Sequence, residues 1–126
     1  MSPLCLIGES DTFLARLLAR FCEASGLSVI RAQVGDEFLA LARAKHPHLM
    51  ILDVELPGEL RGWEAVATLR SDLNGNAAPV IAFSWLPRPE AFALLPDCAV
   101  YLQKPDLHYD DFVAALKEAG FEPAKW

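Results

Sequence analysis

Polar residues that can take part in catalysis follow four separate apolar runs of this sequence. Glu9 and Ser10 come directly after the first run, Asp53 follows the third, Ser84 ends the fourth and Lys104 follows the fifth. Two neighbouring carboxylates repel each other unless a cation lies between them. Mg²⁺ commonly takes one or two carboxylates, with water and phosphate completing its octahedron. The set predicts a site for phosphoryl chemistry with Mg²⁺ as cofactor.

Asp53 is the candidate nucleophile of this set. A carboxylate can attack phosphorus and form an aspartyl phosphate. Phosphoryl transfer depends mainly on positioning and on neutralising charge, which a lysine, a hydroxyl and a metal ion around Asp53 would provide. A plainer interpretation stays open, in which Asp53 is a strand-end carboxylate paired with Lys104.

The residues between these positions alternate between short apolar runs and segments with helical spacing. A polar cluster at 9–12 supplies the N-cap candidates of the first helix, and Asp36 and either Asp110 or Asp111 are the expected N-caps of the second and last helices. A loop is expected at 73–76. Strands are predicted at 4–8, 27–32, 49–52, 79–83 and 99–102, and helices end near 26, 46, 70, 95 and 119.

Five strand–helix repeats predict a parallel sheet with right-handed crossovers and helices on both faces. The expected fold class is α/β, doubly wound and flavodoxin-like, with strand order 2-1-3-4-5. Ligands of such sheets bind at the carboxyl ends of strands 1 and 3, where Glu9, Ser10 and Asp53 lie. We expect one domain over residues 1–126, with its core at about 4–119.

Composition narrows the class of protein further. The 126 residues are 53% hydrophobic and carry a net charge of −6. An acidic chain is a poor direct partner for nucleic acid or an anionic membrane, because both are negative. No apolar run approaches the ~20 residues that span a bilayer. Cys5, Cys22 and Cys98 lack metal-site spacing, so we expect buried, reduced thiols in a cytoplasmic protein.

Four stretches of the sequence resemble the signature segments of bacterial response-regulator receiver domains. They are Leu6–Asp11, Ile51–Gly58, Pro79–Ser84 and Tyr101–Pro105. Each segment is weak alone, but their order and spacing are specific, and the resemblance covers roughly residues 4–119. It implies a two-component signalling domain that is not a classical enzyme and catalyses at most its own phosphorylation and dephosphorylation.

The resemblance also implies how the site is used. In that family the aspartate after the third strand is phosphorylated by a histidine kinase or phosphotransfer protein, which points to Asp53. The metal would be bound by Glu9, by Asp53 and by the backbone carbonyl of Glu55. Ser84 and Lys104 would contact the phosphoryl group.

A switch and an output surface are implied as well. Tyr101 matches the aromatic residue that swings inward on activation, together with Ser84. A downstream protein partner would bind through the fourth helix, fifth strand and fifth helix. Whether the chain forms a homodimer is left open.

The sequence departs from the family pattern at three places near the site. Ser10 replaces the second acid of the pair after the first strand, and a hydroxyl is a weaker ligand than a carboxylate for a hard cation. We therefore expect weakened Mg²⁺ affinity, for which the Glu55 carboxylate can partly compensate. Trp85, where a small residue is usual, either covers Asp53 or lies outward. The turn at 56–62 is one residue longer than usual.

Other functions remain in competition at this stage. The departures favour a degenerate receiver that acts as an interaction module without phosphorylation, whereas Asp53, Ser84 and Lys104 favour the phosphoacceptor. The acids at Asp53 and Glu55 also suggest an aspartate-nucleophile phosphohydrolase, although the usual Asp-x-Asp is missing. A flavin-binding domain is disfavoured, because no phosphate-binding loop follows the first strand.

Overall fold

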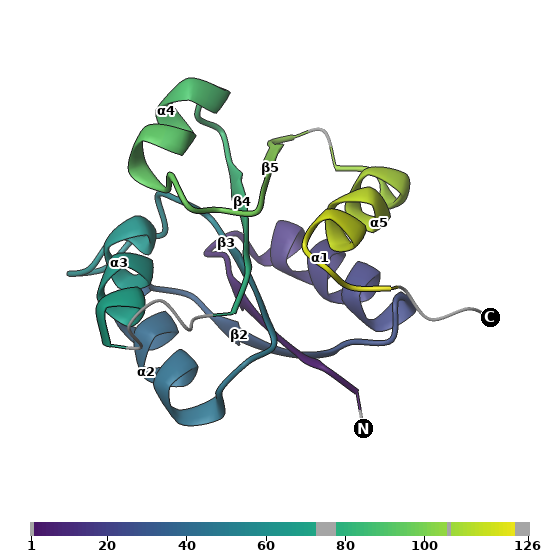
Figure 1. Ribbon diagram of the computed structural model, residues 1–126, viewed down its shortest axis with the longest axis horizontal. Coiled ribbons are helices and arrows are strands. Elements are labelled where there is room, and N and C mark those ends of the chain that lie inside the picture. Colours follow the sequence, from purple (N-terminus) through teal and green to yellow (C-terminus); the bar gives the residue numbers. More distant parts are fainter. Residues whose placement is uncertain (1, 73–77, 106, 123–126) are drawn as a thin grey trace.

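Strands and helices alternate along the chain in the computed structural model, which describes residues 2–72, 78–105 and 107–122 (Figure 1). The loop expected at 73–76 lies outside the described residues. In chain order the elements are β1 (Leu4–Gly8), α1 (Thr12–Ala24), β2 (Ser28–Ala32), α2 (Gly35–Lys45), β3 (Leu49–Leu52), α3 (Gly62–Asp72), β4 (Val80–Ser84), α4 (Arg88–Leu94), β5 (Val100–Gln103) and α5 (Tyr109–Glu118).

The strands form one parallel sheet in the order β2-β1-β3-β4-β5. The predicted fold class and strand order are confirmed. Gly8 pairs with Leu52 in the sheet, so the residues that follow, Glu9 and Asp53, leave neighbouring strands side by side. The amide of Asp53 donates to the Gly8 carbonyl at 2.9 Å. The register therefore places both carboxylates at the carboxyl edge of the sheet.

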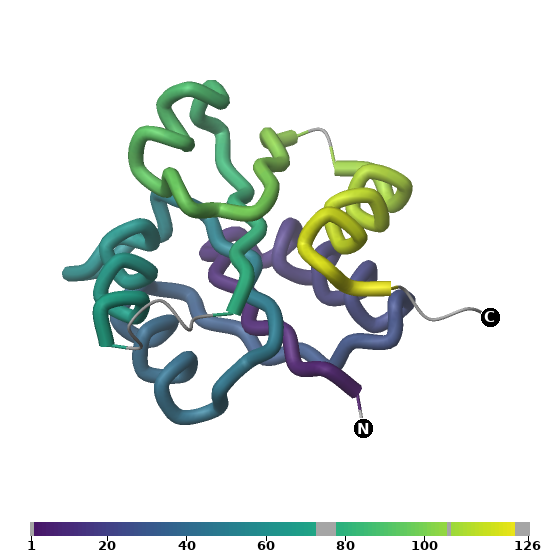
Figure 2. Tube along the Cα trace, in the orientation of Figure 1, coloured from purple at the N-terminus to yellow at the C-terminus, as the bar shows by residue number. Residues whose placement is uncertain are grey.

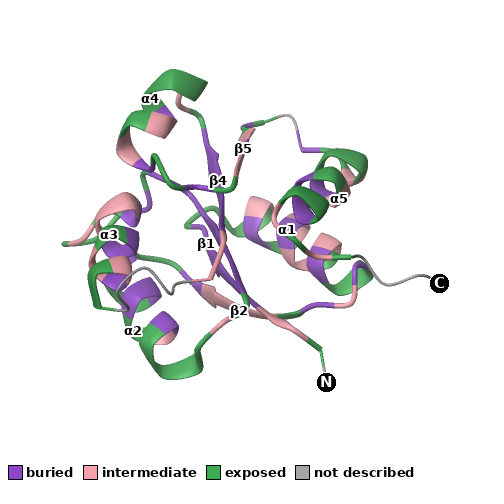
Figure 3. Ribbon diagram, viewed as in Figure 1, coloured by how far each residue is buried: buried purple, intermediate pink, exposed green. Residues whose placement is uncertain are grey.

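Helices cover both faces of the sheet, as the continuous apolar strands require. One core cluster joins α1 and α5 to residues such as Ile7 and Ile51. The other joins α2, α3 and α4 to residues such as Leu6 and Met50. Figure 3 shows the buried strands between helices that expose their outer faces. Neighbouring residues of one strand thus point into different cores, which fixes the orientation of each strand end.

Helix N-termini account for the main local differences from the sequence predictions. Strands β1 and β3 have the predicted bounds, and the other elements differ by one or two residues. The prediction that Asp36 caps α2 is wrong, because Val34 is the N-cap residue and the Asp36 carboxylate accepts from the amide of Leu60 at 2.9 Å. His108, in extended conformation, is the N-cap residue of α5, and the expected caps lie in its first turn.

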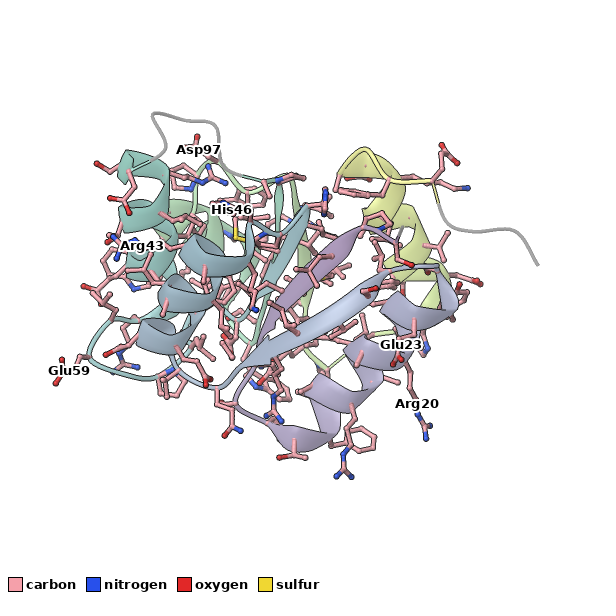
Figure 4. The ribbon with its side chains drawn as sticks, turned by 90° about the horizontal axis from the view of Figure 1, so that it is seen from below. Arg20, Glu23, Arg43, His46, Glu59 and Asp97 are labelled. Atoms are coloured by element: carbon pink, nitrogen blue, oxygen red, sulfur yellow. The ribbon has the colours of Figure 1, made fainter. Side chains whose placement is uncertain are left out.

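The long β3–α3 loop, residues 53–61, is attached to the start of α2. The amide of Gly35 donates to the carbonyl of Pro57 at 2.7 Å, and Asp36 binds Leu60 as described. A Cβ atom on Gly35 would lie 1.9 Å from the Leu60 carbonyl oxygen, so only glycine permits this approach. Glu59 projects from the loop toward solvent (Figure 4).

The three cysteines are free and buried, in agreement with the expectation for Cys5, Cys22 and Cys98. No helix in the described ranges is long and apolar enough to cross a membrane. The Cα trace passes from β4 to α4 at the end of the molecule that lies far from the N-terminus (Figure 2).

Candidate functional site

The two acidic residues of the predicted pocket are both buried. Asp53 is only 8% exposed and Glu9 only 1%. Each backbone is held by a neighbouring strand, since the amide of Glu9 donates to Ala32 O at 3.1 Å and the amide of Asp53 to Gly8 O at 2.9 Å. A buried carboxylate is stable only when it is paired or hydrogen-bonded, so the partners of these two side chains define the site.

Lys104 lies between the two carboxylates. Its Nζ is 2.8 Å from Asp53 Oδ2 and 2.7 Å from Glu9 Oε1, and its own amide donates to Ser84 O at 2.7 Å. Burial acts to lower the pKa of the Lys104 ammonium, but its hydrogen bond to Asp53 and its ion pair with Glu9 outweigh that effect and raise the pKa above its ordinary value. The lysine is therefore a fixed positive charge in the pocket.

The remaining carboxylate oxygens contact backbone amides. Asp53 Oδ1 accepts from the amide of Glu55 at 2.9 Å, and Glu9 Oε2 accepts from the amide of Asp11 at 3.0 Å. Glu9 Oε1 is within ion-pair distance of Lys104 but is not aligned with any hydrogen-bond donor among the described residues. This buried oxygen keeps acceptor capacity that a cation can use.

The donor set fits Mg²⁺ with few protein ligands. Glu9 and Asp53 offer two carboxylates at one edge, which is the number that Mg²⁺ commonly takes from a protein. Ser10 and the Glu55 side chain are exposed. Within the described ranges no group of three His, Cys, Asp or Glu residues is assembled. Compensation for Ser10 by the exposed Glu55 carboxylate stays a prediction.

Tyr101 binds the backbone of Ser84 and of the β4–α4 loop that follows it. Ser84 is fully buried, and its Oγ accepts from the amide of Leu86 at 3.1 Å. The Tyr101 hydroxyl donates to Ser84 O at 3.0 Å and also to Leu86 O. Tyr101 is thus already on the inside of the fold, and burial raises the pKa of its hydroxyl.

Trp85 stands beside the pocket and is 58% exposed. Its ring centre is 6.0 Å from Lys104 Nζ, and the ring of Phe83 is 5.0 Å from the same atom. The indole therefore lies largely outward while remaining near the ammonium group. The Lys104 side chain is 2% exposed, and the Asp53 side chain keeps 11% of its surface in contact with solvent.

Asp11, from the polar cluster at 9–12, is the N-cap residue of α1 and accepts from the amide of Leu14 at 2.9 Å. Two contributions to the site were missed by the sequence reasoning. Arg31 donates from Nε to Glu9 O at 3.0 Å and from Nη2 to Ser10 O at 3.2 Å. Gly62 lies against the Asp53 backbone, where a Cβ atom would be 2.2 Å from the carbonyl oxygen. A lone charge in the strand at 28–32 was the available signal for Arg31.

The comparisons with known proteins agree with this arrangement. Residues 5–116 match the response regulator receiver domain family. The polar-differentiation response regulator DivK of Brucella ovis and that of Brucella abortus are each 34% identical to this chain over 125 residues, covering 93% of this chain and 95% of the relative.

Solved structures give the same result for the fold. The receiver domain of the Francisella response regulator 1452 has a TM-score of 0.80 and 25% identity, covering 94% of this chain and 96% of that one. The Vibrio cholerae chemotaxis protein CheY4 has a TM-score of 0.82 and 20% identity, covering 94% and 99%. With a family match over most of its length, this chain belongs to the response regulator receiver domains of two-component signalling.

Proposed function

We propose that Asp53 accepts a phosphoryl group from a histidine kinase or phosphotransfer protein, with Mg²⁺ as cofactor, and that this switches binding of a downstream protein. The observation that supports it best is the buried Lys104 ammonium, 2.8 Å from Asp53 Oδ2. A nucleophilic carboxylate that remains partly solvent-accessible beside a fixed positive charge meets the main electrostatic need of phosphoryl transfer.

The proposed step moves one phosphoryl group between two side chains. A carboxylate oxygen of Asp53 attacks phosphorus, and the bond from phosphorus to the donor's imidazole nitrogen breaks. That nitrogen leaves with the electron pair, and because the other ring nitrogen carries a proton, the donor histidine ends as neutral imidazole. Lys104 offsets charge on the phosphoryl oxygens, and Glu55 N holds the other oxygen of Asp53 in place. Mg²⁺, bound through Glu9 and Asp53, would add further neutralisation of the phosphoryl group.

Two features shape the proposed output. The α4–β5–α5 face carries a shallow groove lined by residues that include Arg88, Phe92 and Asp111. The Arg88 guanidinium lies 5.8 Å from the ring centre of Tyr101 and 5.7 Å from that of Phe92. Because Tyr101 also binds the β4–α4 loop, a change at Ser84 would reach this face directly. The cytoplasmic location and the identity of any partner stay predictions.

A second candidate function is a receiver that works without phosphorylation. Tyr101 is already buried and bound to the carbonyls of Ser84 and Leu86, and Ser10 contributes no carboxylate. A pocket fixed in this way favours a constant binding surface. Membership of the receiver family favours either signalling function over the phosphohydrolase and flavin-binding alternatives.

The phosphoacceptor function is tested by intact mass after incubation with acetyl phosphate and Mg²⁺. We expect a mass gain of one phosphoryl group, absent from Asp53→Asn and retained in Asp97→Asn. Asp97 is a suitable control because it is an exposed acid, labelled on the outer surface in Figure 4. An unmodified wild-type chain, under conditions that modify another receiver domain, would contradict the proposal.

Amide NMR spectra of the modified chain separate the two candidates. A phosphorylated switch predicts shifted resonances across the β4–α4 loop and β5. If the adduct forms and these resonances do not move, the constant binding surface is favoured.

A further inference from the structure

Arg31 makes an unusual contact for a charged residue within a strand. It lies in β2 opposite Ile7 of β1, and it is half-buried. Its guanidinium reaches past the end of β1 and donates to the carbonyls of Glu9 and Ser10, at 3.0 and 3.2 Å. A planar guanidinium that binds two successive carbonyls fixes their relative orientation.

The same turn carries the Glu9 side chain into the pocket. The amide of Glu9 is held by Ala32 O at 3.1 Å, and its carbonyl is held by Arg31. The Glu9 carboxylate then accepts from the amide of Asp11 and faces Lys104. The amide and the carbonyl of Glu9 are thus both bound by residues of β2.

Position 10 of the turn carries no charge, and a positive charge lies beside it. Ser10 stands where a second acid was expected, and Arg31 binds the Ser10 carbonyl. Among the buried and half-buried groups here, Glu9 and Asp53 carry two negative charges, and Lys104 and Arg31 carry two positive charges. The carboxylates of Asp11 and Glu55, in contrast, are exposed and screened by solvent. A balanced set of this kind attracts a divalent cation less than a set with excess negative charge.

We propose that Arg31 is a positioning residue that holds the β1–α1 turn without metal and whose charge lowers the affinity of the pocket for a divalent cation. This inference deepens the proposed function and rests on it for the choice of cation. Metal binding and amide exchange test it, and neither measurement depends on whether Asp53 accepts a phosphoryl group.

The positioning role is tested by NMR exchange of the Asp11 amide proton, which donates to Glu9 Oε2. In metal-free buffer we expect exchange to be about fivefold or more faster in both Arg31→Gln and Arg31→Lys, because neither substitute retains the two-carbonyl contact. Arg43→Gln is the matched control, since Arg43 pairs with Asp72 on the outer surface (Figure 4). Unchanged Asp11 exchange in both Arg31 variants would overturn the positioning role.

The charge effect is tested by the binding of Mn²⁺, a magnetic substitute for Mg²⁺, followed by loss of the free-ion electron paramagnetic resonance signal. Arg31→Gln and Arg31→Lys both lose the guanidinium contact with two carbonyls, and they differ by one charge. The ratio of their Mn²⁺ dissociation constants therefore isolates the effect of charge. We expect Arg31→Gln to bind Mn²⁺ about threefold or more tightly than Arg31→Lys, given partial screening by solvent and salt. Equal affinities for the two variants would overturn the charge effect. Thermal melts of both variants confirm that folded proteins are compared.

Discussion

The hydroxyl of Tyr101 donates a hydrogen bond to the backbone carbonyl of Ser84, across 3.0 Å in the interior of the fold. The same hydroxyl binds Leu86 O, so one side chain of β5 holds both ends of the turn that leaves β4. This turn contains the candidate phosphoryl-contacting hydroxyl and Trp85. Tyr101 is therefore as much a part of the pocket's support as of the output face.

Replacing Tyr101 with phenylalanine is expected to lower the free energy of unfolding by about 1–2 kcal/mol, because carbonyls that the hydroxyl satisfied lose their donor. Urea denaturation measures the change. Tyr109→Phe is the matched control, since its hydroxyl has one bond, to Ser25 Oγ at 3.2 Å, and should cost about 1 kcal/mol or less. Equal losses in the two variants would show that the Ser84 and Leu86 contacts add nothing.

The stability of the fold is expected to fall in alkaline solution. The pKa of Tyr101 is raised above 10.0, chiefly by burial. The pKa of Lys104 is raised above 10.5, because its carboxylate hydrogen bonds outweigh the opposing effect of burial. The folded chain thus keeps protons that the unfolded chain has released. The free energy of unfolding is highest below about pH 10 and declines as the pH rises through the folded-state values.

Denaturant titrations at several pH values between about 9 and 11 test this sign. Tyr101→Phe should show a shallower decline than the wild type, because one group with a raised pKa is removed. Burial also raises the pKa of the Cys5 and Cys98 thiols, and these contribute the same decline to both proteins. A steeper decline in that variant would contradict the assignment.

Lys104→Met is expected to lower the free energy of unfolding by about 3 kcal/mol at neutral pH, because it leaves two buried like charges without their shared partner. Part of the loss should be recovered near pH 5, where one carboxylate can take up a proton. Denaturation at the two pH values provides the measurement. Lys117→Met, an exposed change on α5, should show neither the loss nor the recovery.

Asp11→Ala and Ser10→Asp distinguish two neighbouring positions of the β1–α1 turn. Asp11 caps α1, so its loss should cost about 1 kcal/mol of stability and leave Mg²⁺ affinity nearly unchanged. Ser10→Asp should strengthen Mg²⁺ binding by about tenfold through an added carboxylate ligand. Isothermal titration with Mg²⁺ measures both. If Asp11→Ala abolishes binding, Asp11 and not position 10 is the acid that serves the metal.

Much of the fold was predictable because the strands are short apolar runs that end in polar residues. Leu49–Leu52 is buried along its whole length, and such a continuous apolar run indicates a strand that is covered on both faces. Asp53 and Lys104 were predictable as neighbours for the same reason, since the ends of parallel strands share an edge. Their chemical role remains a proposal.

The contacts that the sequence did not predict join segments that are far apart in the chain. Asp36 was expected to cap its own helix, but the approach of the β3–α3 loop to Gly35 offers its carboxylate another amide donor. The contacts of Arg31 depend on the turn after β1, which packs beside the end of β2. Neither contact follows from local spacing, because each depends on how two crossover connections pack.

The junction of Gly35 with Pro57 and Leu60 has a mechanical consequence. Helices α2 and α3 are coupled by the loop that begins at Asp53, so a displacement of that loop would have to carry both helices. The loop after β4 is joined to β5 by the Tyr101 hydroxyl, at Ser84 O and Leu86 O, and by the Lys104 amide at Ser84 O. It leads into one short helix, α4, so under the proposed function a change at Asp53 would displace α4 more readily than the coupled pair α2 and α3.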